Sequence, residues 1–332
     1  MVMSANTFWD GGETDFPTSG SVRQKLGHAV KCATMTAAMD EWQPWQFHPD
    51  DNHVELSADM DPESESVDPD GRELMIRCGE ALFHLKLALR CFGCLGRVEL
   101  FPKFDQAGLV ARVHGGISSD CGARDLVLFE AMTRGQGNLM SWNERPARES
   151  IVEIFKGAMA GEKAWLEFSQ CESSRNRLVT FAEFGSKSPM AGHEREVRAL
   201  DSRVALWTKP LFTFIVRGNE AESITVEPVS RRAEQMTALA VIKTKTDDKH
   251  GWLAAGQAMA RIRLQARASE ISSQVFDQSF RSRYVREELR TSIGHKGFGQ
   301  AIIGFGSQPA VPQPAGFAAS LGAAIPSRSR VD

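Results

Sequence analysis

The sequence predicts two similar halves, built of helices and short strands, that pack together as a pseudo-dimer. The main observation is a long apolar helix in residues 68–94 whose pattern recurs, without a gap, in residues 248–271. Gly79 falls on Gly256 in this register, and small or aliphatic residues coincide around it. The length of 332 residues is ample for two domains of ordinary size. Chance likeness between two amphipathic helices is the alternative, but the shared glycine and the ungapped register favour duplication.

The first long helix has a defined start and a continuous apolar face. Asp68 is suited to accept hydrogen bonds from the first turn, Pro69 suits the first helical position, and Glu73 places a negative charge near the positive helix end. Apolar or small residues follow at steps of three and four: Leu74, Cys78, Ala81, Leu82, Leu85 and Leu89. Gly79 lies inside this face and costs about 1 kcal/mol relative to alanine. We therefore expect another backbone to approach closely there.

The other elements are predicted from local patterns in chain order. Helices are expected at Val22–Met39, Glu149–Met159 and Phe280–Ile293. Strands are expected around Trp45–Phe47 and at His53–Leu56, Arg97–Phe101, Ala164–Phe168, Leu239–Thr246 and Gln300–Phe305. Apolar segments at Leu126–Met132 and Trp207–Val216 are not assigned to a type. His84 is expected on the polar side of the first long helix.

Composition limits the class of protein. Hydrophobic residues make up 42% and charged residues 24% of the chain, as in soluble globular proteins. The formal charge of −3 favours neither nucleic acid nor an anionic membrane as a partner. No apolar run approaches the roughly 20 residues of a membrane span, and no secretory signal is recognised. We expect a cytoplasmic protein.

The six cysteines and eight histidines do not predict a redox or metal site. Cys91 and Cys94 form a single CxxC at the end of the first long helix. A zinc or thioredoxin-like role would need a second pair, or a strand followed by a helix that starts at the motif. We therefore interpret these thiols as packing residues. Since no HxxxH or HxH spacing is present either, no metal site is predicted.

Three segments carry motifs of one family. Gln43-Pro44-Trp45 is similar to the end of the motif APSxHNxQPW. The helix from Gly71 through Leu82 is similar to the motif GREx4CGAxL. The run from Ile293 through Gly306 is similar to the motif IGx5QxxxRxG. In this order and spacing they resemble the Acg-like branch of the nitroreductase superfamily. The helix around Gly256 resembles the corresponding helix of that branch's second half. The resemblance is continuous over residues 22–112 and 236–306.

The resemblance implies an α+β, nitroreductase-like fold. In this branch the second half of the chain takes the place of the partner subunit of dimeric members. The resemblance also implies FMN as cofactor, with hydride passing from NAD(P)H through the flavin to a nitro or quinone acceptor. The protein then holds the flavin and adjusts its electronic properties. No side chain need act covalently, and no catalytic residue is identified.

Four candidate cofactor-binding residues follow from the resemblance: Gln43, Trp45, Arg134 and Gln300. Gln43 and Trp45 either line a flavin edge or only seat the corner between helix and strand. Arg134 lies one position out of register with a family arginine. The alternatives to it are Arg217, Arg231 and Arg232.

Other family positions have changed. The family serine falls on Ala38, the asparagine on Glu41 and an arginine on Gly304, and the closing arginines fall near Pro314, where there are none. Phosphate is normally held by guanidinium groups or helix N-termini. Because each charge-assisted bond is worth about 1.5–3 kcal/mol, we expect weakened or altered FMN binding.

Two functions therefore stay open. The first is an FMN-associated oxidoreductase, and the alternative is a cofactor-free pseudoenzyme that acts as a scaffold or a store for a ligand or flavin. In either case we expect a small-molecule ligand or flavin as partner, and the internal pseudo-dimer makes a monomer possible. The predicted organisation is a flexible arm at 1–20, halves at 21–135 and 136–306, and an extended or disordered tail at 307–332.

Overall fold

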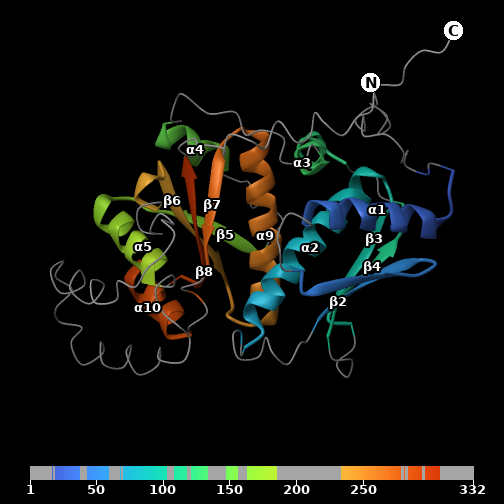
Figure 1. Ribbon diagram of the computed structural model, residues 1–332, viewed down its shortest axis with the longest axis horizontal. Helices are drawn as coiled ribbons and strands as arrows, with labels where there is room; N and C mark the ends of the chain where they lie inside the picture. Colours follow the sequence, from blue (N-terminus) through green and yellow to red (C-terminus); the bar gives the residue numbers. More distant parts are fainter. Residues whose placement is uncertain are drawn as a thin grey trace, which may run out of the picture.

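Two four-stranded antiparallel sheets lie on either side of a central pair of helices, α2 (Arg72–Cys91) and α9 (Lys249–Ala268) (Figure 1). This architecture comes from a computed structural model. The structure describes residues 17, 19–37, 43–59, 68, 70–102, 108–117, 121–133, 147–155, 163–184, 233–277, 280, 283–293 and 296–306. The architecture is α+β, as the family resemblance implied.

The remaining elements divide between the two sides. Around the first sheet lie α1 (Val22–Ala37), β1 (Trp45–Pro49), β2 (His53–Ala58), β3 (Leu95–Leu100), β4 (Leu109–Gly115) and α3 (Ala123–Thr133). Around the second lie α4 (Arg148–Phe155), β5 (Ala164–Phe168), α5 (Glu172–Phe184), β6 (Ala238–Thr244), β7 (Ser272–Phe276), α10 (Arg283–Ile293) and β8 (Phe298–Gly306).

The two sheets have the same strand order relative to their long helix. The first has the order β1-β2-β4-β3, with α2 between β2 and β3 in the chain. The second has the order β5-β6-β8-β7, with α9 between β6 and β7. In both sheets the second and fourth strands along the chain pair at the centre, as in the pairs Leu56↔Ala111 and Ala240↔Ile303.

The two long helices cross where each carries its interior glycine. A Cβ atom on Gly79 would lie 2.3 Å from the Leu253 carbonyl oxygen, and one on Gly256 would lie 1.9 Å from the Ile76 carbonyl oxygen. Both obstacles are backbone atoms, so no side-chain rotation relieves them. The close approach expected at Gly79 is therefore present, and the backbone that approaches is that of α9.

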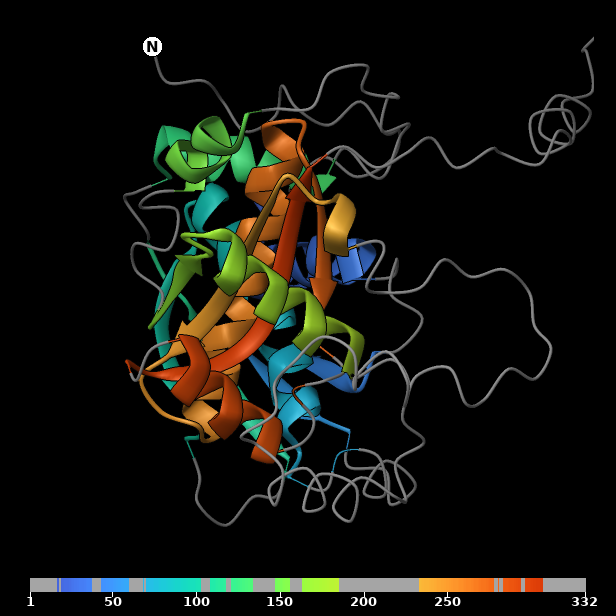
Figure 2. The ribbon, with the colours of Figure 1, turned by 90° about the vertical axis from the view of Figure 1, so that its left-hand side faces the viewer.

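The second sheet is buried on both faces because helices cover each of them, and successive residues of a strand point to opposite sides. Ala240 and Ile242 of β6 pack with the helix α9, whereas Leu239 and Val241 pack with α5 and α10. Figure 2 shows α5 and α10 on the outer side of this sheet. The near-continuous apolar character of β6 and β8 follows from this double coverage.

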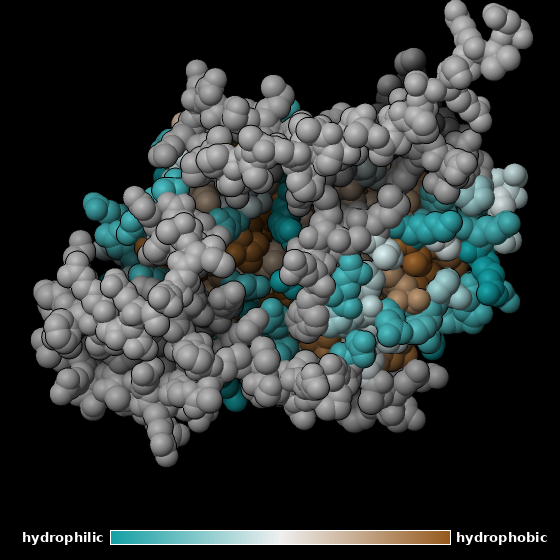
Figure 3. Space-filling view, viewed as in Figure 1, coloured by the Kyte–Doolittle hydropathy of each residue, from teal (hydrophilic) through white to brown (hydrophobic). Residues whose placement is uncertain are grey.

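The first sheet instead has one apolar and one polar face. Along β2, Val54 and Leu56 are buried in the core with α1 and α2, and the alternate residues His53 and Glu55 are partly exposed. Figure 3 shows hydrophilic residues on the side of the molecule where this sheet lies, with hydrophobic residues recessed between them. None of the helices in the described part combines the length and apolar character of a membrane span.

Several expectations need correction. The first long helix begins at Arg72 rather than at Pro69, although Asp68 does cap its first turn. His84 is 8% exposed rather than on a polar side, and α2 is packed against α1, α3, α9 and the first sheet. Three elements, β4, β7 and α5, were not predicted, and the unassigned apolar segment Leu126–Met132 lies in the helix α3. The segment at 207–216 and the tail at 307–332 lie outside the described residues.

Candidate functional site

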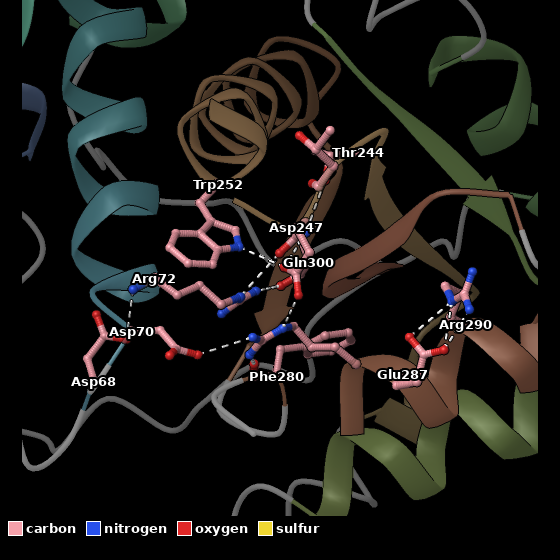
Figure 4. A network of polar contacts seen from close by, with 12 residues as sticks. Asp68, Asp70, Arg72, Thr244, Asp247, Trp252, Phe280, Glu287, Arg290 and Gln300 are labelled. Atoms are coloured by element: carbon pink, nitrogen blue, oxygen red, sulfur yellow. Dashed lines mark hydrogen bonds and ion pairs between the residues drawn. The ribbon is translucent and has the colours of Figure 1, made fainter. Parts of the chain in front are cut away.

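A buried polar cluster lies where the start of α2 meets the second sheet (Figure 4). Arg72 comes from α2, Gln300 from β8, Asp247 from the turn between β6 and α9, and Arg286 from α10. We call these four residues the Arg72–Gln300 cluster. The four residues come from four separate segments, and Arg72 is the contribution of the first long helix.

Gln300 is fully buried and uses both ends of its amide. Its Oε1 accepts a hydrogen bond from Nε of Arg72 at 3.2 Å, and its backbone oxygen accepts one from Nη2 of the same residue. Its Nε2 donates to Oγ1 of Thr244 at 3.0 Å and to Oδ1 of Asp247 at 3.2 Å. Gln300 therefore holds Arg72 in place and joins it to Asp247.

Asp247 is the acidic centre of the cluster. Its Oδ2 accepts from Nε of Arg286 at 2.9 Å, and its Oδ1 accepts from Nε1 of Trp252 at 2.7 Å. Burial by itself raises the pKa of Asp247, but the bonds from Trp252, Arg286 and Gln300 outweigh it and hold the pKa below its usual value. The carboxylate is therefore ionised at neutral pH.

The two arginines are almost completely buried, at 2% exposure for Arg72 and 1% for Arg286. Burial lowers the pKa of Arg72 to about 10, and the charge of Arg286 acts in the same direction. Arg286 also donates to the Phe280 carbonyl oxygen at 2.7 Å and lies 3.4 Å from Oδ2 of Asp70. The guanidinium of Arg72 lies 5.9 Å from the centre of the Phe280 ring. Arg72 therefore remains charged at neutral pH.

Backbone N–H groups at the N-termini of α2 and α9, beside the cluster, already donate hydrogen bonds to side-chain carboxylates. The carboxylate of Asp68 accepts from the backbone nitrogens of Arg72 and Leu74 at 2.9 and 3.0 Å. The carboxylate of Asp248 accepts from those of His250 and Gly251 at 3.0 and 2.9 Å. A phosphate would normally use such N–H groups.

The cluster therefore does not fit a flavin phosphate as it stands. Its positive charge would suit an anion, but the guanidinium donors described above bind protein oxygens and both N-termini are capped by carboxylates. Nor does the described part of the chain bring together three His, Cys, Asp or Glu side chains able to hold a metal ion. What the arrangement does is fasten the start of α2 to β8 and α10.

Comparison with known proteins gives the relationship of the chain. No family model matches it. A Mycobacterium tuberculosis protein named "Putative NAD(P)H nitroreductase Rv3131" is 23% identical over 320 residues, covering 91% of this chain and 89% of that protein. "Putative NAD(P)H nitroreductase acg" of the same organism is 34% identical over 74 residues, 22% of each chain. These matches support a distant relationship to the nitroreductase superfamily.

A third match has no assigned activity. The uncharacterized protein Rv3127 of M. tuberculosis is 21% identical over 315 residues, covering 87% of this chain and 89% of that protein. The matches to Rv3131 and Rv3127 each extend over nearly the whole of both aligned proteins. The similarity to Rv3131 is therefore not confined to one shared motif.

The residues expected to bind a nitroreductase cofactor are spread across the structure. Gln43 is partly buried just before β1, and Trp45 begins that strand at 8% exposure with its ring 5.0 Å from that of Phe47. Both belong to the side of the first sheet, whereas Gln300 lies in the second. Arg134 lies outside the described residues, as do Arg217, Arg231 and Arg232.

Sequence reasoning missed Asp247 and Arg286 and used Arg72 only as part of a helix motif. Asp247 directly precedes the helix cap Asp248, and Arg286 lies in a polar helix, so neither has a pattern that marks it as buried. Arg72 and Gln300 are 228 positions apart. Both lie in segments that resemble family motifs, and this was the one signal that could have linked them.

Proposed function

We propose that this chain is a nitroreductase-type, NAD(P)H- and FMN-dependent oxidoreductase whose flavin binding is weakened. The observation that carries the proposal is the match, over 91% of the chain, to the protein named "Putative NAD(P)H nitroreductase Rv3131". The α+β arrangement of two sheets around two long helices is consistent with it. The weakening is inferred from the replaced family positions and from the internally satisfied Arg72–Gln300 cluster.

We further propose that the halves 21–135 and 136–306 descend from one duplicated unit and form a pseudo-dimer. Three observations support this: the common strand order, the equivalent places of α2 and α9 between strands, and the contact between Gly79 and Gly256. A duplicated chain supplies both sides of the interface that a dimeric relative builds from two subunits. We therefore expect a monomer in solution.

For the cofactor site we propose Gln43, Trp45 and Arg134 as residues that contact FMN, and Gln300 as a residue that acts through Arg72. The reason for the separate role of Gln300 is that both ends of its amide are hydrogen-bonded inside the protein. Replacing those bonds with bonds to a ligand would leave the buried charge of Arg72 without its acceptor, which is costly.

A second candidate function is a cofactor-free pseudoenzyme that serves as a scaffold or binds a small ligand. The specific observation in its favour is the closed state of the Arg72–Gln300 cluster, in which carboxylates cap both helix N-termini. A cluster of this kind stabilises the junction between the two sheets without a bound anion. Fold similarity alone does not decide between the two functions.

FMN titration of the purified full chain tests the proposal. We expect quenching of FMN fluorescence on binding, and oxidation of NAD(P)H when a quinone or nitro acceptor is added. Gln43→Ala should weaken FMN binding, whereas Gln46→Ala, an exposed glutamine on the neighbouring strand, is the matched control and should bind as the wild type does. Failure of folded wild-type protein to bind added FMN would reject the oxidoreductase and support the pseudoenzyme. Equal affinities of the two variants would remove Gln43 from the site.

A further inference from the structure

Two cysteines that are distant in sequence meet at the end of α2. Cys91 is the last residue of that helix, and Cys121 lies two positions before the start of α3. Their Sγ atoms are 2.8 Å apart. This separation is less than 1 Å longer than a covalent S–S bond of about 2.05 Å. The two thiols are therefore already paired in space.

Other contacts hold the same two segments together independently of the sulfur atoms. Nη1 of Arg90 donates to both carboxylate oxygens of Asp125 at 3.2 and 3.3 Å. The rings of Phe92 and Phe129 pack edge to face with centroids 5.3 Å apart. The backbone around Cys91 is thus fixed relative to α3 by an ion pair and an aromatic contact on either side of it in sequence.

The partner of Cys91 differs from the one that the sequence pattern presents. The CxxC spacing places Cys94 next in the chain, but Cys94 follows the helix end, where its backbone nitrogen donates to the Leu89 carbonyl oxygen. The sulfur contact that the structure contains is with Cys121, 30 positions away. Neither Cys91 nor Cys121 has a role in the Arg72–Gln300 cluster.

We propose that Cys91 and Cys121 form a reversible disulfide when the protein meets a peroxide. Cys121 is the partly exposed member and Cys91 is 9% exposed, so Cys121 is the one that the oxidant reaches first. Its thiolate attacks a peroxide oxygen, the O–O bond breaks, and a sulfenic acid and one water are produced. The Cys91 sulfur then attacks the sulfenic sulfur, the S–S bond forms, and a second water leaves. In sum, two thiols and hydrogen peroxide give one disulfide and two waters.

The surroundings set the rate of this reaction. Burial raises the pKa of Cys91 and of Cys121, and the carboxylate of Asp125 raises both further, while the charge of Arg90 opposes it. Since the thiolate is the reacting form, oxidation at neutral pH is slow. The pair therefore responds to sustained peroxide and does not turn over rapidly like a peroxidase.

The crosslink would fasten the end of α2 to the start of α3, a helix whose other end already contacts α9. Arg267 of α9 donates to the Ala131 carbonyl oxygen of α3 at 3.0 Å. A bond between Cys91 and Cys121 would close a loop over 30 positions of chain. Closing such a loop removes entropy from the unfolded chain, so oxidised protein should melt at a higher temperature than reduced protein.

Thiol counting and peptide mapping of the folded full chain test the proposal. The Cys171→Ser variant, which lacks the exposed cysteine, provides a background without intermolecular disulfides. After treatment with hydrogen peroxide and alkylation, its five thiols should fall to three. Trypsin cleaves after Arg90 and Arg97, and after Arg112 and Arg124, so the expected product joins peptide 91–97 to peptide 113–124 with Cys94 alkylated.

Two further variants test the pairing of Cys91 with Cys121, and two results would contradict it. Adding Cys121→Ser, or Cys91→Ser, should abolish the crosslinked peptide, and the former changes only a partly exposed side chain, so folding should survive. An internal disulfide within peptide 91–97 would show that Cys91 pairs with Cys94, and would overturn the proposal. So would five alkylated thiols after prolonged peroxide treatment.

Discussion

The crossing of α2 and α9 predicts a large effect of a single methyl group. In Gly256→Ala the new Cβ would lie 1.9 Å from the Ile76 carbonyl oxygen and 2.9 Å from Cα of Gly79. Ordinary contact begins near 3.4 Å, so the helices must separate by roughly 1.5 Å. The obstacles are backbone atoms of a buried helix. Overpacking of a core costs 1–3 kcal/mol, and we expect about 3 kcal/mol here, since side chains on both sides of the crossing also lose contact.

Urea unfolding followed by circular dichroism measures this loss. In thermal unfolding, the same cost of about 3 kcal/mol corresponds to a fall of about 4 °C in the melting temperature of a chain of this size. Gly27→Ala is the matched control, because a Cβ at that position in α1 meets nothing within 4 Å. It should stabilise the protein by up to about 1 kcal/mol through helix propensity. A Gly256→Ala variant as stable as the wild type would refute the reasoning.

The two glycines should also be coupled. Gly79→Ala meets the Leu253 carbonyl oxygen at 2.3 Å and should be destabilising in its own right. Once the first substitution has separated the helices, the second meets a wider gap. The double variant should therefore lose less stability than the two single variants added together. Additive losses would mean that the two residues act at separate contacts.

Further predictions concern the polar cluster, the helix cap and the thiols. Asp247→Asn should cost about 3 kcal/mol, because it leaves buried Arg286 with only its longer, 3.4 Å ion pair to the more exposed Asp70. The pKa of Asp247 in the folded protein lies below its unfolded value of about 3.9. The difference in unfolding free energy between wild type and Asp247→Asn should therefore be complete above about pH 5 and vanish as the pH falls through the folded pKa. Acid unfolding of the two proteins measures it, and an unchanged difference at pH 3 would contradict it. Asp68→Ala should cost 0.5–2 kcal/mol in urea unfolding by removing the cap of α2; no loss would mean that water replaces the cap. Peroxide treatment should raise the melting temperature by about 5 °C in the wild type but not in Cys121→Ser, and an equal rise in both would place the effect elsewhere.

Much of the fold could be predicted because its elements have strong local patterns. The helix expected over residues 248–271 is α9 at Lys249–Ala268, with Asp248 as its cap. The strand expected at Leu239–Thr246 is β6. By contrast, β7 is a short edge strand containing two serines and a glutamine, so its composition is not typical of a strand. The structure reveals it through its pairing with β8.

The candidate site was less accessible to sequence reasoning. The family resemblance pointed to Gln300, but it could not supply the bonds that use both ends of its amide. Asp247 and Arg286 had no pattern of their own, because a buried ion pair is recognised by its surroundings and not by its spacing in the chain. The prediction for His84 was wrong for a related reason, since α2 is buried by helices and a sheet from other parts of the chain that pack around it.

The sequence by itself determined the long apolar helices, the glycine in each, and the alternating strands, because helix and strand periodicity are local properties of the chain. The tertiary structure alone decided which residues meet: Gly79 with Gly256, Arg72 with Gln300, and Cys91 with Cys121 in place of Cys94. Such partners are set by how helices cross and sheets align, and separations of 30 to 228 positions leave no trace in a local pattern.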